Sequence, residues 1–242
     1  MKIAFISDIH GNAVALEAVL QDIQSKKVDQ IAVLGDLCFR GPEPKRTLDL
    51  IRSLHANVIK GNGDEWVVRG FGKGEVPDEM VDMLNQERDW TMSKLDQEDI
   101  TYLNELPRQL TLKINGKLTI HAFHATPTSL FDVVYPDEKD DVIRQKLMST
   151  ADAEMYVYGH IHHPFIRFVN GKWVVNIGSV GLPFDGLAKA SYVIVECHEN
   201  GIHTSIERVA FDLDKVISQY ESFHYPNANA LSNAVRYAAF PK

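Results

Sequence analysis

The sequence has 242 residues, of which 45% are apolar and 24% charged, so intrinsic disorder, collagen and a long coiled coil are excluded. The net charge of −8 and the lack of a run of Lys and Arg argue against duplex nucleic acid and anionic membranes as partners. Two cysteines are too few for a disulfide framework. No apolar stretch is as long as the roughly 18 residues that a membrane-spanning helix needs. We therefore expect a cytoplasmic protein. The sequence leaves the oligomeric state open.

The first 60 residues alternate between strand-like and helix-like patterns. Residues 2–7 form an apolar run that predicts a buried strand, and Asn12 is placed to cap a following helix with one apolar face. Two further short strands are expected at 31–34 and 57–60, with a second helix between them. Strands separated by helices are typical of βαβ units, so we expect a parallel sheet in this part of an α/β fold.

Residues 65–106 are charged, follow a helical period and contain few β-branched residues. This predicts an insert of short helices whose aromatic residues form a local core. The alternative is that the insert walls a cleft and selects the substrate. Three later Asn-Gly pairs indicate hairpins, with strands at 109–114 and 117–123, 165–169 and 172–175, and 191–197 and 203–209. Helices are also expected at 138–149, 212–222 and near the C-terminus. No linker or repeat divides the chain, so we expect one domain over residues 1–242.

Candidate metal ligands follow the first three predicted strands. Asp8 and His10 come directly after the first strand, Asp36 follows the second, and Asn62 follows the third. Residues two apart in an extended segment point to the same side, and the carboxyl ends of parallel strands share one edge of a sheet. We therefore expect these four side chains to lie together.

Histidines provide further candidates later in the chain. His121 and His124 follow another apolar strand, and His160 and His162 stand two positions apart after a strand at 155–158. Carboxylate, amide and imidazole ligands without thiolates suit Mn²⁺, Fe, Ni²⁺, Co²⁺ or Zn²⁺ rather than Ca²⁺. We expect two divalent metal ions, with Mn²⁺ preferred and Mg²⁺ as a further alternative.

The order and spacing of these residues resemble the motifs of calcineurin-like metallophosphoesterases. That pattern reads Asp-x-His, Gly-Asp, Gly-Asn, a His before a small residue, and Gly-His-x-His. The matching residues here are Asp8 and His10, Gly35 and Asp36, Gly61 and Asn62, His124 and Ala125, and Gly159, His160 and His162. The segment 176–181 is similar to the Asn-x-Gly-Ser turn of the small bacterial and archaeal branch, and the motifs span residues 8–181 in the family's order.

This resemblance implies a metal-dependent phosphoesterase with a four-layer αββα sandwich and two mixed β-sheets. It implies that Asp36 bridges two ions. The other ligands would be Asp8, His10 and His162 for one ion, and Asn62, His124 and His160 for the second. Two close ions lower the pKa of a shared water and hold a phosphate, so the hypothesis is attack by a metal-bridging hydroxide without a covalent enzyme intermediate. The partner would be a small phosphorylated substrate, with nucleotides among the candidates.

Two positions depart from the family pattern. Many members have Gly-Asn-His in the third motif, where the His is taken to assist the leaving group, but this chain has Gly63. The second Asp of Gly-Asp-x-x-Asp-Arg-Gly is replaced by Phe39, whereas Arg40 is retained. A phosphate leaving group has a second pKa of about 6 and needs little protonation. We therefore expect diesters with activated leaving groups or phosphoanhydrides, such as those of dinucleoside polyphosphates.

Several roles stay open at this stage. Arg40 either binds phosphate through its planar fork or forms a surface ion pair. His124 is preferred over His121 as the ligand, and His121 is either an ordinary strand residue or a contact to substrate. Asp64 is expected to cap a helix or support a ligand. The alternatives to this hydrolase are a non-catalytic metal-binding scaffold for protein interaction and a cyclic-nucleotide phosphodiesterase. The expected catalytic residues are Asp36, Asn62, Arg40 and His121.

Overall fold

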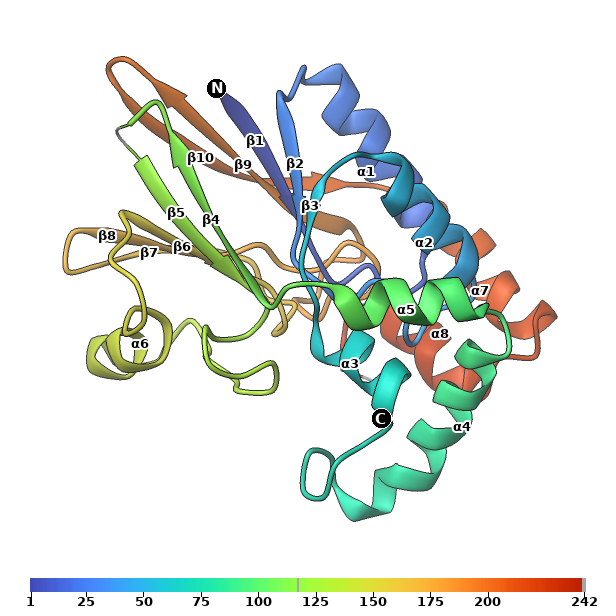
Figure 1. Ribbon diagram of the computed structural model, residues 1–242. Coiled ribbons are helices and arrows are strands. Elements are labelled where there is room, and N and C mark those ends of the chain that lie inside the picture. Colours follow the sequence, from blue (N-terminus) through green and yellow to red (C-terminus); the bar gives the residue numbers. More distant parts are fainter. Residues whose placement is uncertain (117, 241–242) are drawn as a thin grey trace.

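The computed structural model describes residues 1–116 and 118–240, which form two five-stranded β-sheets flanked by helices (Figure 1). The first sheet has the strand order β10-β9-β1-β2-β3. β1, β2 and β3 are parallel, as the βαβ pattern predicted, and β9 runs antiparallel to β1. These strands are β1 (Lys2–Ile6), β2 (Gln30–Val33), β3 (Asn57–Val58), β9 (Ala190–His198) and β10 (Gly201–Val209).

Helices connect the parallel strands of the first sheet. α1 (Ala13–Ser25) links β1 to β2, and α2 (Pro44–Ser53) links β2 to β3. The Asn12 side chain accepts a hydrogen bond from the Ala15 N–H, which confirms Asn12 as the N-terminal cap of α1. β1 ends at Ile6, slightly earlier than predicted, because the chain turns at Asp8, where φ is 53°.

The second sheet has the order β4-β5-β6-β8-β7 and mixes parallel with antiparallel pairs. The predicted hairpins β4–β5 and β7–β8 are confirmed, and Lys117 in the first of them lies outside the described residues. The third hairpin, β9–β10, is longer than predicted: Gly201 already pairs with His198, because glycine readily adopts its φ of 155°. The strands are β4 (Gln109–Ile114), β5 (Leu118–Phe123), β6 (Met155–Tyr158), β7 (Phe165–Val169) and β8 (Lys172–Asn176).

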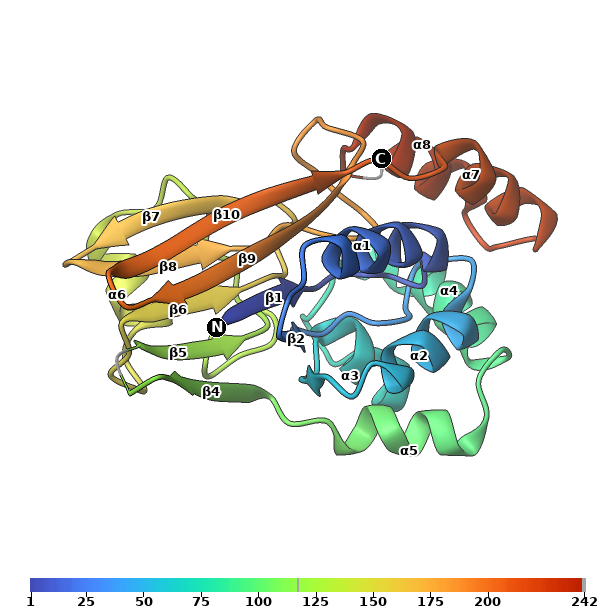
Figure 2. The same ribbon diagram turned by 90° about the horizontal axis from the view of Figure 1, so that it is seen from above.

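The two sheets face each other, and helices cover their outer faces (Figures 1 and 2). Between the sheets, Phe5 of β1 belongs to one apolar cluster with Ile120 of β5 and Val157 of β6. α1 and α2 pack on the outer face of the first sheet through a separate cluster. α6 (Asp140–Leu147) packs on the outer face of the second sheet through Ile143. This arrangement confirms the predicted αββα sandwich with two mixed sheets.

Further helices lie beside this sandwich. The helical insert begins at Asn62, earlier than the expected 65–106. It consists of α3 (Asn62–Arg69), the 3₁₀ helix η1 (Asp78–Met80), α4 (Val81–Met92) and α5 (Gln97–Glu105). Trp90 of α4 packs against an apolar cluster formed by α7 (Leu213–Ser222) and α8 (Ala228–Tyr237). The organisation of residues 1–242 as one domain stays a prediction. None of the described helices is both long and apolar enough to cross a membrane.

Candidate metal centre

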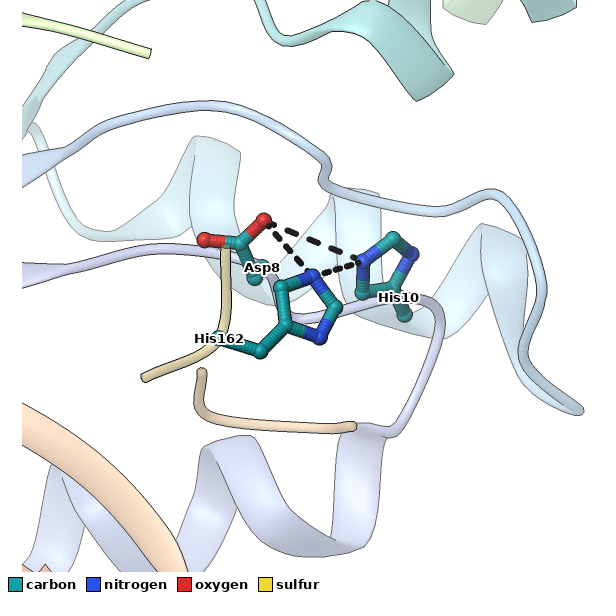
Figure 3. A group of neighbouring side chains, drawn as sticks. All are labelled: Asp8, His10 and His162. Atoms are coloured by element: carbon teal, nitrogen blue, oxygen red, sulfur yellow. Dashed lines mark hydrogen bonds and ion pairs between the residues drawn. The ribbon is translucent and has the colours of Figure 1, made fainter. Parts of the chain in front are cut away.

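Asp8, His10 and His162 meet in a buried cluster (Figure 3). Asp8 and His10 lie in the turn that follows β1, and His162 lies in the loop that follows β6. Nε2 of His162 is 3.1 Å from Oδ1 of Asp8 and 3.2 Å from Nε2 of His10. That nitrogen of His10 is in turn 3.9 Å from Oδ1 of Asp8. Two predicted motifs from distant parts of the sequence are therefore adjacent in space.

The hydrogen bonds of the two rings determine which nitrogens carry protons. Nδ1 of His10 donates to the Phe39 carbonyl at 2.9 Å, and Nδ1 of His162 donates to the Leu182 carbonyl. In the neutral rings Nε2 is then unprotonated, so two lone pairs face each other across 3.2 Å. Oδ1 of Asp8 is a third buried acceptor and has no hydrogen-bond partner among the described residues. Three acceptors directed at one point fit a bound cation.

A second group shares Asp8 and adds Asp36 and His124. Asp36 follows β2, whereas His124 follows β5 of the opposing sheet. Oδ1 of Asp36 is 3.5 Å from Nε2 of His124, and Oδ2 of Asp36 is 3.6 Å from Nε2 of His10. Each oxygen of Asp36 thus lies toward one of the two groups. This position is compatible with a bridging ligand, and the bridging role itself stays a prediction.

The remaining predicted ligands, Asn62 and His160, border the second group. Oδ1 of Asn62, the first residue of α3, is 2.8 Å from Nε2 of His124, whose Nδ1 donates to the Leu34 carbonyl. The centre of the His160 ring lies 5.1 Å from that of the His124 ring. The backbone N–H of His160 donates to Oδ2 of Asp8 at 3.0 Å. The structure therefore brings all seven predicted ligands together, and their division between two ions stays a prediction.

Burial determines the charge of these ligands. Burial and neighbouring histidine rings lower the pKa of His10 and of His160 to about 3, so both rings are neutral at pH 7. Burial and the charge of Asp8 raise the pKa of Asp36 to about 8. A cation beside the two carboxylates would favour the ionised form of Asp36. Neutral imidazoles together with carboxylates suit first-row divalent metals.

Left-handed backbone turns direct the ligands toward one another. The φ angles of Asp8, His10, Asp36, His160 and His162 lie between 48° and 67°. Asp and His enter this region more often than most residues that carry a Cβ atom. Such conformations cost about 1–3 kcal/mol each and are typical of functional sites. The Asp-x-His and Gly-His-x-His turns are therefore strained in the same way on both sides of the cluster.

The loop after β3 approaches Asp36 very closely. A Cβ atom on Gly61 would lie 2.2 Å from Oδ1 of Asp36, so only glycine fits there. The Asp64 carboxylate accepts hydrogen bonds from the N–H groups of Asp36, Leu37 and Gly61 at 2.8, 2.9 and 2.8 Å. The expectation that Asp64 caps a helix is confirmed, because its bond from the Gly61 N–H is part of the capping box of α3. Asp64 also joins the two loops that carry Asp36 and Asn62.

The guanidinium of Arg40 is held through its Nε atom. Its Nε donates to Oε2 of Glu87 on α4 at 3.0 Å, and Nδ2 of Asn227 donates to the other Glu87 oxygen at 3.3 Å. Within the described part of the chain, the buried Nη2 of Arg40 has no hydrogen-bond partner. The expected ion pair thus exists, but it is buried rather than at the surface. Sequence reasoning missed Glu87, because its local pattern matches that of other charged helix residues.

A cavity of about 200 Å³ opens onto the cluster. Five of the predicted ligands line it, together with Arg40 and Gly63. Apart from Glu75, apolar side chains form the rest of its wall. Several come from the insert at 65–106, which was expected either to form a local core or to wall the cleft, whereas the others were not assigned to the site from the sequence. An apolar residue in a helix looks the same in the sequence whether it faces a core or a cavity. The larger wall residues are Phe39, Trp66, Met80, Leu84, Phe184 and Phe240.

His121 does not line this cavity. Its Nε2 contacts Oε1 of Gln109 at 2.8 Å, and its ring packs against Phe123 and Tyr156. Phe123 and Tyr156 belong to the apolar cluster beneath α6, on the outer face of the second sheet. His121 and His124 lie on the same strand–loop segment, but only His124 turns toward the ligands. The expectation that His121 contacts substrate is therefore not retained, because its side chain faces the other side of the sheet.

Comparisons with known proteins agree with this geometry. A family model for the calcineurin-like phosphoesterase superfamily domain matches residues 1–200. An uncharacterized protein of Methanocaldococcus jannaschii is 33% identical over 234 residues, which cover 88% of this chain and 89% of that protein. A symmetrical bis(5′-nucleosyl)-tetraphosphatase of Erwinia tasmaniensis is 27% identical over 139 residues, or 55% of this chain. That match spans 47% of the tetraphosphatase, about half of its length.

Solved structures share the fold along nearly the whole chain. A metallophosphoesterase from Sphaerobacter thermophilus has a TM-score of 0.78 and 26% identity, and the match covers 98% of this chain and 99% of that one. A protein from Pyrococcus horikoshii has a TM-score of 0.82 and 22% identity, and the match covers 100% of this chain and 98% of that one. At this identity, the second match shows a shared fold and nothing more. The chain therefore belongs to the calcineurin-like phosphoesterase superfamily and is a phosphoester hydrolase.

Proposed function

We propose that the protein is a dinuclear, metal-dependent hydrolase of phosphodiester or phosphoanhydride bonds in small phosphorylated substrates. The observation that carries this proposal is the pair of buried ligand groups that share Asp8, with a cavity opening onto them. Family membership supports divalent metal ions as the cofactor. Mn²⁺ is the first candidate, because carboxylate, amide and imidazole ligands together suit it.

The chain's own residues have distinct parts in this proposal. When bound, the two ions would polarise phosphate oxygens and lower the pKa of a shared water. Nη2 of Arg40 would donate a charge-assisted hydrogen bond to a phosphate oxygen, and the ion pair with Glu87 keeps the guanidinium in place. The proposed ligands are Asp8, His10 and His162 for one ion, Asn62, His124 and His160 for the other, and Asp36 for both.

Gly63 supports a substrate whose leaving group needs no proton. Its N–H donates to Oδ1 of Asp36 at 2.7 Å, but it has no side chain that could act as an acid. A leaving phosphate is a weak base, whereas an alkoxide is a strong one, so anhydrides and activated diesters need less assistance. The partial similarity to symmetrical bis(5′-nucleosyl)-tetraphosphatases supports nucleotides as the substrate class. Dinucleoside polyphosphates are therefore the first natural substrates to test.

The experiment is metal add-back to stripped protein. Mn²⁺, Ni²⁺, Mg²⁺ and Zn²⁺ would be added separately, and hydrolysis of bis-nitrophenyl phosphate, nitrophenyl phosphate and diadenosine tetraphosphate would be measured in parallel. We expect metal-dependent turnover of the diester and the anhydride and slower turnover of the monoester. Bound metal without turnover of any substrate would favour the scaffold alternative. A preference for the monoester would contradict the argument from Gly63.

A further inference from the structure

The cavity of the metal centre is lined by polar and by apolar side chains. Five predicted ligands, Arg40 and Glu75 are polar. The apolar side of the lining includes Trp66 and Met80 from the helical insert, and Phe184 and Phe240 from the C-terminal third of the chain. A phosphate held at the ligands would be bound by the polar groups. The apolar side chains therefore suit a second, uncharged part of the substrate.

The aromatic rings of this apolar side are held in defined positions. Phe184 stacks on the His162 ring with centroids 4.3 Å apart and an interplanar angle of 19°. Phe240 packs edge-on against Phe184 at 5.3 Å and is still 60% exposed. Nε1 of Trp66 donates to Oε2 of Glu75 at 2.9 Å, which fixes the indole. Trp66 and Phe184 are half-buried, and aromatic rings that line a ligand cavity are suited to stacking on a planar group.

We infer that Trp66, Phe184 and Phe240 form a subsite for a planar aromatic group attached to the reacting phosphate, either an aryl ring or a nucleobase. This inference rests on the proposed function, because the phosphate would be anchored at the metal centre. The cavity of about 200 Å³ is smaller than the roughly 300–1,000 Å³ of sites for drug-sized ligands. It therefore accommodates one such ring beside the phosphate, and a longer substrate would extend into solvent.

The test compares the binding of phosphonates that are not hydrolysed. Calorimetry would measure the Kd of methylphosphonate and phenylphosphonate with the Mn²⁺-loaded protein. We expect phenylphosphonate to bind at least 10-fold more tightly, which corresponds to about 1.4 kcal/mol. Phe240→Ala should reduce this ratio to 3-fold or less. Tyr237→Ala is the matched control, because Tyr237 is 65% exposed on the same C-terminal segment and does not line the cavity.

Each outcome has a separate meaning. Equal binding of the two phosphonates, or an unchanged ratio in Phe240→Ala, would overturn the subsite and leave the proposed function intact. Binding of neither phosphonate by the metal-loaded protein would overturn the proposed function instead. A second pair, adenosine 5′-monophosphate and ribose 5-phosphate, distinguishes the two sources of the ring. If adenosine 5′-monophosphate binds more tightly than ribose 5-phosphate, the subsite binds a nucleobase. If only phenylphosphonate binds more tightly than its partner compound, the subsite binds an aryl group bonded to phosphorus.

Discussion

Asp8 and Asp36 bring two carboxylates into one buried space with four histidine rings. Without a cation, burial and the charge of Asp8 raise the pKa of Asp36 to about 8, so a proton takes the place of a positive ion. A metal that binds there must displace this proton, which makes metal affinity depend on pH.

The metal-free protein should lose stability as the pH rises from about 6.5 to 8. Asp36, with a pKa of about 8, and Asp64, with a pKa of about 7, keep their protons in the folded state after the unfolded chain has lost them, so both residues favour unfolding as the pH rises. His10 and His160, with a pKa of about 3, have the opposite effect, but only below about pH 6.5. We expect a loss of about 2 kcal/mol between pH 6.5 and 8. Urea unfolding of chelator-treated protein measures it, and a rise over this interval would contradict the assignment.

Asp36→Asn should abolish activity while the protein stays folded. The amide has nearly the same shape, but it carries no charge to hold the cations. We expect activity to fall by more than about 100-fold, since even the outer partners of metal ligands contribute 10–100-fold. Metal content, circular dichroism and turnover would be measured together, with the exposed Asp78→Asn as control. Normal metal content and rate in Asp36→Asn would exclude Asp36 as a ligand.

Most of the predicted ligands could be found from the sequence, because strand periodicity and parallel pairing determine where strand ends meet. Asp8 and Asp36 follow parallel strands, and this local signal was sufficient to group them, whereas His124 was added through the resemblance to the family motif. His121 precedes His124 by only three positions. The face of the sheet on which its side chain lies depends on the register with Thr111 and Tyr156, which the sequence does not reveal.

At the scale of elements, α4 contributes to the site without providing a predicted ligand. Glu87 reaches from this helix to Arg40, which lies in the loop between β2 and α2. Both side chains are largely buried, with exposed fractions of 0% for Glu87 and 12% for Arg40. Tyr220 of α7 donates to the Arg40 carbonyl at 2.9 Å. The insert and the C-terminal helices therefore hold the loop that carries Arg40.

A double-mutant cycle separates the structural and functional parts of this ion pair. Glu87→Met should destabilise the protein by about 3–5 kcal/mol, because it leaves the Arg40 charge buried without a partner. Arg40→Met combined with Glu87→Met should recover most of that stability, since apolar pairs replace buried ion pairs well. The double variant should still lose more than 10-fold in kcat/KM, because it lacks the nitrogen that we propose to bind phosphate. Full activity in the double variant would contradict the role given to Arg40.

The observed helices and strands match the predicted ones where local interactions determine them. Asn12 capped α1, and the Asn-Gly turns joined β4 to β5 and β7 to β8. The sequence could not show that β9 pairs with β1, because pairing between strands so far apart depends on the packing of the whole sheet. For the same reason, the sequence could not show that Phe240 lines the cavity.

At the scale of the whole molecule, the metal centre lies where the two sheets meet. Asp8 and Asp36 follow strands of the first sheet, and His124 and His162 follow strands of the second. Metal binding should therefore stabilise the contact between the sheets. At 100 times Kd, one bound ion contributes about 2.7 kcal/mol.

Thermal unfolding with and without Mn²⁺ measures this effect. We expect a higher Tm with metal and a larger increase at pH 8 than at pH 6, because fewer protons compete for Asp36 at the higher pH. Asp36→Asn should show little increase at either pH. An equal metal-induced increase in the variant and the parent protein would show that the stabilising ion binds elsewhere.

The separation between paired segments has a consequence during synthesis. His10 and His162 are 152 positions apart, and β1 is paired on one side by β9, which begins at Ala190. A ribosome needs roughly 10–40 s to extend the chain that far at about 5–20 residues per second. Until then, β1 lacks its partner β9, although the second-sheet ligands His124 and His162 have already been synthesised. We therefore expect that a nascent chain that ends before β9 does not hold metal stably at this centre.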